Sequence, residues 1–198
     1  MELPEPLQDW LDLFAQPWRP VNNAMLLGWG VVFCLFLLYA ATHDPVNYFI
    51  HLLWLPIHEG GHLFFGWFGN QTLMIAGGTL MQLFAPFALA IYFASLRQPA
   101  ATAFCVYFFF EEFLDVAVYM ADARAHDLPL VTVGDPGDNP VDHDWTYLFT
   151  RFGLLQHDRQ IAAIMRFIGW VGMVAVIAWL AWRWHQDREA PRPFSSGA

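Results

Sequence analysis

The organisation of this chain follows from one stretch, Ile57-His58-Glu59-Gly60-Gly61-His62-Leu63-Phe64-Phe65. It sets the pattern His-Glu-x-x-His among apolar and aromatic residues. On a helix, the two histidines lie on one face, one turn apart, and can bind the same Zn²⁺. Glu59 is then placed to accept a proton from a water molecule that the metal activates. The stretch predicts a zinc site on a helix, with His58 and His62 as ligands and Glu59 as the catalytic base.

The composition is that of a membrane protein. Of the 198 residues, 57% are hydrophobic, 18% aromatic and 14% charged, against about 25% charged in an average soluble domain. The chain has nine basic and eighteen acidic residues, and this excess of negative charge argues against nucleic acid as a partner. The length suits one domain, and the bilayer itself is the expected surroundings.

The apolar runs predict an all-α fold, a bundle of about five transmembrane helices, because each run approaches the roughly twenty residues needed to cross a bilayer. An N-terminal interfacial segment, 1–20, precedes the transmembrane domain, 21–184, and a disordered tail, 185–198, follows it. An acidic, turn-rich loop, 123–158, separates the last two spans. Arginines near the end favour a cytoplasmic C-terminus, which with five spans puts the N-terminus outside. The predicted spans are 22–41, 46–68, 72–96, 100–121 and 161–182.

The fourth predicted span carries Glu111, Glu112 and Asp115 near its middle. Ionised carboxylates at that depth are costly, so they must face a cavity, a partner or a cation. Glu111 and Glu112, together with Gln82 in the third span, are candidates for groups that hydrogen-bond to the metal ligands.

A catalytic zinc takes three protein ligands and leaves one position open. His51 lies seven residues before His58, about 10 Å along a helix, so it cannot share the ion. Matching the depths of the second and fourth spans favours Asp115 as the third ligand. Asp122, two turns further along the same stripe, and His143, in the loop, are the other candidates.

The pentad in a spanning helix resembles the site-2 protease family of intramembrane zinc metallopeptidases. Two further features carry the likeness: the glycine-rich Gly77-Gly78-Thr79-Leu80-Met81-Gln82 that opens the next span, and an aspartate that ends a later one. The resemblance implies that Asp122 is the third ligand and that Asp115 takes the place of that family's Asn. It further implies a Zn²⁺-dependent hydrolase, in the inner membrane of a prokaryotic cell, that cleaves a membrane-embedded protein or peptide.

Two other functions fit parts of the sequence. The acids of the fourth span could form a proton or cation path in a transporter, or belong to a non-proteolytic assembly subunit. Histidines on spanning helices could also be axial ligands of haem, but this predicts a second well-placed histidine on another span, and none is found in the sequence.

Overall fold

The computed structural model describes residues 5–43, 51–128 and 143–189. Within these ranges every regular element is helical, which confirms the all-α class. Among the described residues, three stretches are long and apolar enough to cross a membrane, namely α2, α4 and the run Leu155–Glu189, so the chain has the character of an integral membrane protein. The elements are α1 (Glu5–Ala15), α2 (Asn23–Thr42), α3 (His51–Gly66), α4 (Gln71–Ser95), α5 (Pro99–Ala121), α6 (Asp144–Arg151), the 3₁₀ turn η2 (Leu155–His157) and α7 (Asp158–Glu189).

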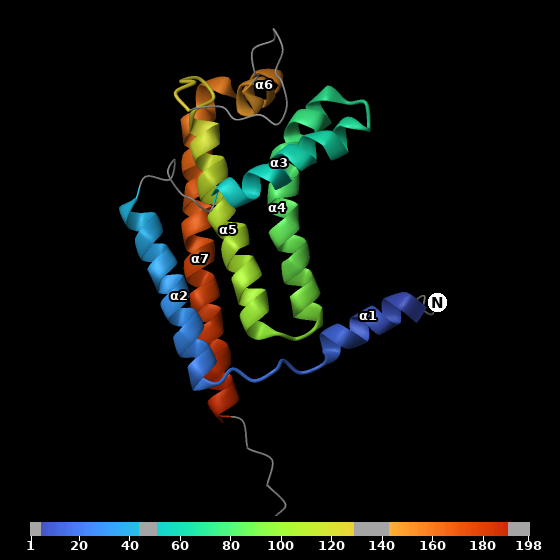
Figure 1. Ribbon diagram of the computed structural model, residues 1–198, viewed down its shortest axis with the longest axis vertical. Coiled ribbons are helices and arrows are strands. Elements are labelled where there is room, and N and C mark those ends of the chain that lie inside the picture. The colour runs from blue at the N-terminus through green and yellow to red at the C-terminus, as the bar shows by residue number, and fades with distance from the viewer. Residues whose placement is uncertain (1–4, 44–50, 129–142, 190–198) are drawn as a thin grey trace, which may run out of the picture.

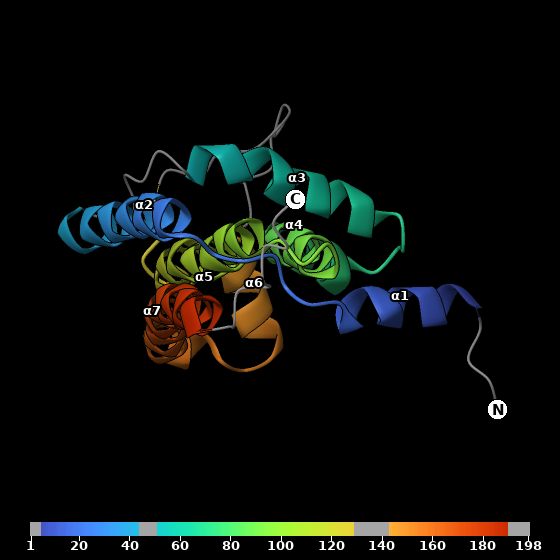
Figure 2. The same ribbon diagram turned by 90° about the horizontal axis from the view of Figure 1, so that it is seen from below.

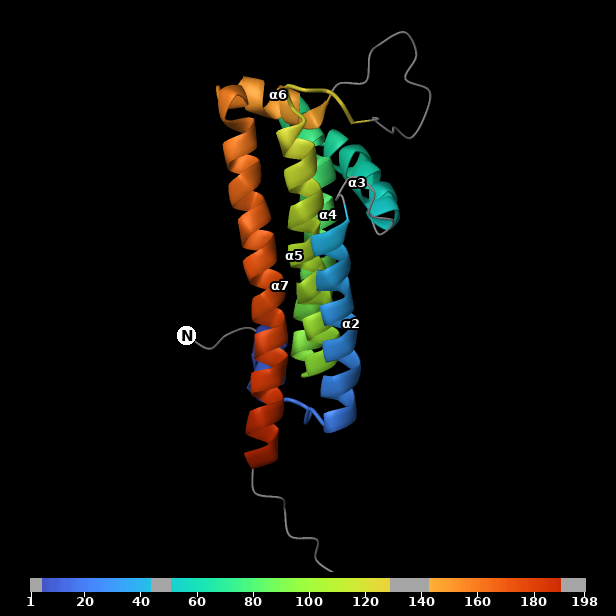
Figure 3. The ribbon, with the colours of Figure 1, turned by 90° about the vertical axis from the view of Figure 1, so that its left-hand side faces the viewer.

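Four long helices, α2, α4, α5 and α7, run side by side and form the body of the molecule (Figures 1 and 3). Helix α5 lies between α4 and α7 and packs against both. The core beside α2 is aromatic: the rings of Phe33 and Tyr107 stack with centroids 4.7 Å apart, and both side chains are fully buried. The Tyr107 hydroxyl donates to the Phe33 carbonyl at 3.3 Å. This contact fixes α2 against α5.

The start of α2 and the end of α7 lie at the same end of the bundle. The indole of Trp184 donates to Asn23 Oδ1 at 2.8 Å, and the Val21 amide donates to Asp187 Oδ2 at 2.9 Å. Figure 2 looks along the bundle from this end, and Figure 3 shows the start of α2 and the end of α7 both at the bottom of the view. Five spans between these two points would instead put the start of α2 and the end of α7 on opposite sides of the membrane.

The reason for the difference is α3. The second span was predicted over 46–68; the described part of α3 has 16 residues, and it runs obliquely across the end of α4 rather than along the bundle (Figures 1 and 3). Residues 46–50 lie outside the described ranges. The outer face of α3 is nevertheless strongly apolar, since Leu52, Leu53, Leu63 and Phe64 are exposed. In the turn that follows α3, Trp67 and Phe68 are exposed as well.

The remaining boundaries differ in smaller ways. Helix α1 lies within the segment predicted to be interfacial, and α6 is a short helix within the predicted loop. Helix α7 extends beyond the predicted span 161–182 at both ends, and its last turn takes in residues 185–189 of the predicted tail. Loop residues 129–142 and tail residues 190–198 are not described. The described helices therefore do not confirm the five-span arrangement.

Candidate metal site

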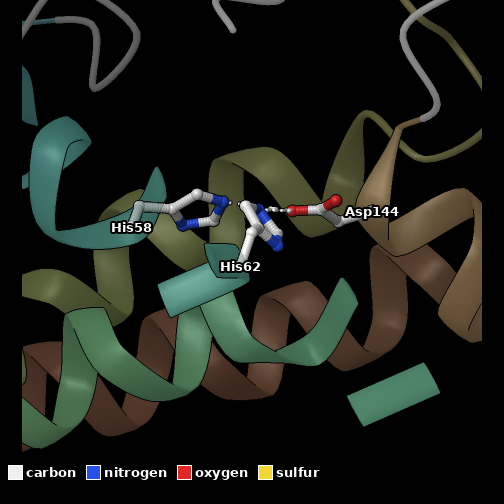
Figure 4. A group of neighbouring side chains, drawn as sticks. All are labelled: His58, His62 and Asp144. Carbon is white, nitrogen blue, oxygen red and sulfur yellow. Dashed lines mark hydrogen bonds and ion pairs between the residues drawn. The ribbon is translucent and has the colours of Figure 1, made fainter. Parts of the chain in front are cut away.

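Three side chains from two helices meet beside the N-terminal end of α4. His58 and His62 come from α3 and Asp144 from the first residue of α6 (Figure 4). Asp144 Oδ2 lies 3.1 Å from His58 Nε2 and 3.2 Å from His62 Nε2. One nitrogen or oxygen of each residue lies within 4.8 Å of the others. In the described part of the chain, this is the group whose atoms could hold one metal ion.

The crossing of α3 over α4 brings the histidines to this place. Gly61 and Gly77 face each other where the two backbones meet: a Cβ on Gly77 would lie 2.7 Å from the Gly61 carbonyl oxygen. Small residues at such a crossing let two helices approach more closely than larger side chains permit. Gly61, one of the two glycines that follow Glu59, therefore determines how closely the histidines approach α4.

Asp144 is positioned by the start of α6. His143 caps this helix, its Nδ1 accepting the Thr146 amide proton at 3.4 Å. The Asp144 amide donates to the hydroxyl of Tyr119, near the end of α5, at 3.2 Å. The side chain of Asp144 is 12% exposed. The group thus combines side chains of α3 and α6, two helices that are far apart in the sequence.

Both imidazoles are oriented by acceptors on α4. His58 Nδ1 lies 3.0 Å from Gln82 Oε1, and His62 Nδ1 lies 2.9 Å from the Met74 carbonyl oxygen. A carbonyl oxygen can only accept, so each Nδ1 carries a proton, and each Nε2 is the atom that faces the Asp144 carboxylate. Metal-binding histidines in proteins are held in this way, by a hydrogen bond from the nitrogen that faces away from the metal.

A glycine on α4 leaves the space into which the two Nε2 atoms point. A Cβ built on Gly78 would lie 2.5 Å from His58 Nε2 and 2.6 Å from His62 Nε2. Two imidazole nitrogens and one carboxylate oxygen are ligands that zinc takes in catalytic sites, where a fourth position stays open. The residues present therefore fit Zn²⁺, which His58, His62 and Asp144 would hold.

The electrostatics of Asp144 suit this role. Burial by itself would raise the pKa of its carboxyl, but hydrogen bonds and charge interactions with His58 and His62 outweigh burial and hold the pKa below its ordinary value. The carboxyl is therefore ionised at neutral pH, as a metal ligand must be.

Glu59, the predicted base, lies one residue after the first ligand. Its carboxylate is close enough to His62 and Tyr119 to interact with both electrostatically, and it is partly exposed. Among the described residues it makes no hydrogen bond or ion pair. Its oxygens are thus available to accept a proton at the edge of the site.

The three residues predicted as third ligand have other positions. Asp122 accepts the amide protons of Asp127 at 2.8 Å and Leu128 at 3.2 Å, and so holds the turn that follows α5. Its Oδ2 is 3.4 Å from His143 Nε2, and burial lowers the pKa of this cap histidine. Asp115 contacts His51 and Gln82. None of the three belongs to the group that the structure brings together.

Asp144 is the residue that the sequence reasoning missed, although it adjoins His143 in Asp142-His143-Asp144-Trp145. The sequence contains one signal for this residue: an acid just before an amphipathic stretch is typical of the first turn of a helix. At the start of α6, the His143 side chain accepts the Thr146 amide proton as the helix cap. The next side chain is then directed elsewhere, in this structure toward α3.

The groups predicted to support the ligands form a second cluster. Gln82 bonds His58 directly and donates to Glu112 Oε2 at 2.5 Å. Glu111 Oε1 lies 3.2 Å from His51 Nε2. The cluster ties α3, α4 and α5 together directly beneath the histidines.

Comparisons of this chain with models of known protein families, with curated proteins and with solved structures gave no significant match.

Proposed function

We propose that this chain is an intramembrane zinc-dependent peptidase, similar to the site-2 proteases, that hydrolyses a peptide bond of a membrane-embedded protein. One observation carries the proposal: the Nε2 atoms of His58 and His62 converge with an Asp144 oxygen over Gly78, while Glu59 stands beside them. This combination of ligands, space and base serves hydrolysis.

The ion and the side chains would have different roles in peptide hydrolysis. When bound, Zn²⁺ lowers the pKa of a water molecule toward neutrality and polarises a carbonyl group. Glu59 accepts the proton of the attacking water and passes it to the leaving amine. Gln82 and Met74 accept the Nδ1 hydrogens of the two imidazoles and so hold both rings in place. The Tyr119 hydroxyl, which accepts the Asp144 amide proton, keeps its own proton free to donate to a nearby oxygen.

The position of the site suggests where a substrate is cut. Gly78 is seven residues from the start of α4, which is about 10 Å along a helix. We propose that α2, α4, α5 and α7 cross the membrane and that α3 enters it from the end at which α6 lies. The scissile bond would then lie near one membrane surface, where an unwound substrate segment and water can both reach it.

The orientation is part of the proposal. We place the end of the bundle that holds the C-terminal end of α7 in the cytoplasm of a prokaryotic cell, because arginines lie there. Arg183 and Arg188 are near the end of α7, and Arg97, whose carbonyl accepts the Arg19 amide proton, stacks on Trp18, which contacts Trp179 of α7. The site then lies toward the opposite surface. A reporter fused after Glu189 and another inserted between residues 129 and 142 would give opposite signals.

The decisive experiment measures metal and cleavage together. Wild-type protein in detergent should bind one zinc, and His58→Ala should bind none. Reconstituted with a panel of single-span substrates, wild type should cleave at least one, and Glu59→Gln should retain zinc but cleave about 10² to 10⁴ times more slowly. A wild-type protein without zinc affinity, or a Glu59→Gln variant with wild-type cleavage, contradicts the proposal.

A second candidate function rests on the cluster of His51, Glu111, Glu112 and Asp115. Glu112 is completely buried and Glu111 is 3% exposed, a costly arrangement that proton or cation transporters use. If this function holds, proton or cation flux into proteoliposomes should be unaffected by Glu59→Gln and abolished by Asp115→Asn. The peptidase predicts that no such flux is observed.

A further inference from the structure

We propose that a groove between α2 and α4 binds one anionic phospholipid, with the phosphate beside Arg19 and an acyl chain along the helices. The groove lies at the end of the bundle opposite the candidate metal site, and its role does not depend on peptidase activity. Two observations carry the proposal: the lining of the groove is apolar, and an arginine without a partner among the described residues lies at its open end.

The groove has the size and surface of a ligand site. Its volume is about 500 Å³, within the range of about 300 to 1,000 Å³ that small-molecule sites occupy. Helix α2 contributes Met25 and Trp29, and α4 contributes Leu89 and Phe93. The first two turns of α5 complete the lining, where the Phe104 ring meets Trp29 edge to face with centroids 5.5 Å apart. Such a surface suits a hydrocarbon chain.

The groove is open toward the outside of the bundle. Leu89 is 49% and Phe104 39% exposed, so the helices do not close over it. Its lining on α5 extends from Pro99 to Cys105, which is about 9 Å along a helix axis. In a bundle that crosses the membrane, a lipid chain can therefore enter the groove from the side.

Arg19 is the charged residue in this lining. It precedes α2, and its amide donates to the Arg97 carbonyl at 3.0 Å. Its side chain is exposed and makes no hydrogen bond or ion pair with any residue that the structure describes. Neighbouring arginines differ: Arg97 Nε donates to the Gln16 carbonyl at 2.6 Å, and Arg183 pairs with Asp187 at 2.9 Å. The Arg19 charge is thus available to an anion from outside the chain.

The start of α5 adds hydrogen-bond donors beside Arg19. Gln98 is the cap residue of this helix, but its side chain makes no capping hydrogen bond. The amides of Ala100 and Ala101, two residues of the groove lining, have no acceptor within the described part of the chain. Free amides at a helix start favour a phosphate. Together with the arginine and the apolar groove, they match an anion that is joined to a hydrocarbon chain.

Aromatic residues place Arg19 at the level of lipid headgroups. Trp18, its neighbour in sequence, contacts Trp179 of α7 with ring centroids 5.4 Å apart, and the Arg97 guanidinium lies 4.5 Å from the centre of the Trp18 ring. Tryptophans are enriched where a bilayer meets water. At the same end of the bundle, α1 extends sideways (Figure 1). The groove therefore begins at the headgroup level and continues toward the bilayer core.

The charges around the groove favour an anionic lipid over a zwitterionic one. The groove lining contains no aspartate or glutamate, so a choline or ethanolamine cation would find no counter-ion there and would lie near Arg19. The chain as a whole carries a net charge of −9 and repels anionic lipids in general. A preference for an anionic lipid would thus come from a local site.

Native mass spectrometry of the detergent-purified protein tests the proposal with phosphatidylglycerol and phosphatidylcholine that have identical chains. Wild type should bind one phosphatidylglycerol about fivefold more tightly than phosphatidylcholine, the factor that one arginine near an anionic headgroup contributes. Arg19→Gln should bind the two lipids equally. Arg188→Gln, the same charge change at the same end but outside the groove lining, should keep the wild-type preference.

Ala101→Leu tests the acyl chain separately. The larger side chain occupies part of the groove, so the affinity for both lipids should fall while their ratio stays the same. Equal binding of both lipids by wild type overturns the proposal, and so does a wild-type preference in Arg19→Gln. Loss of the preference in Arg188→Gln also contradicts it, because net charge alone would then explain the binding. Each result is independent of whether the chain binds zinc or cleaves peptides.

Discussion

Replacing Gly78 by alanine is the most direct perturbation of the candidate metal site. The added Cβ would lie 2.5 Å from His58 Nε2 and 2.6 Å from His62 Nε2, where contacts below 3.0 Å are essentially never found. The first ring must therefore move by at least 0.5 Å, the difference between 3.0 and 2.5 Å. Metal–ligand distances tolerate only about 0.2 Å, so the two nitrogens cannot keep a common ion.

The same substitution should leave the protein folded. Alanine in place of a helix glycine stabilises by about 1 kcal/mol. The displaced rings lose their bonds to Gln82 and Met74, at about 1 kcal/mol each. The net change in the free energy of unfolding is about 1 kcal/mol destabilising, which a folded domain survives.

The assay compares Gly78→Ala with Gly60→Ala, in which the added Cβ meets nothing within 4 Å. Zinc affinity by competition with a chelator should fall at least about 100-fold in Gly78→Ala, or about 2.7 kcal/mol, and stay at the wild-type value in Gly60→Ala. Near-ultraviolet circular dichroism checks the fold of both. Wild-type zinc affinity in a folded Gly78→Ala protein would refute the geometry of the site.

Other substitutions separate the site from its scaffold. Asp144→Asn should lower zinc affinity by at least about 100-fold. Asp122→Asn should leave it within about threefold while lowering the melting temperature, because both Asp122 carboxylate oxygens accept amide protons and an amide side chain has one acceptor oxygen; the opposite ranking would restore Asp122 as the ligand. Tyr107→Phe removes the hydrogen bond to the Phe33 carbonyl and should lower the free energy of unfolding by about 1 kcal/mol, with zinc affinity unchanged, as measured by thermal denaturation and chelator competition. Asn70→Ala removes the cap of α4, whose side chain accepts the Leu73 amide proton, and should cost about 1 kcal/mol by the same denaturation assay.

Local features of the sequence determined which residues could carry the chemistry. The spacing of His58 and His62 places them on one helix face by geometry alone, and the apolar runs identify α2, α4 and α7 as lengths that can cross a bilayer. The cost of burying acids led to Glu111, Glu112 and Asp115 as groups with partners. Each of these deductions depends on residues within one helix.

Tertiary structure decided what no single helix contains. The third side chain in the group is Asp144, 82 residues beyond His62, because the start of α6 reaches the crossing of α3 and α4. That crossing depends on close contact between Gly61 and Gly77, and its oblique angle removes the parallel span on which the depth argument for Asp115 relied. A helix pattern records which face is apolar but not the angle at which that face meets a neighbour, since the angle depends on side chains of both helices.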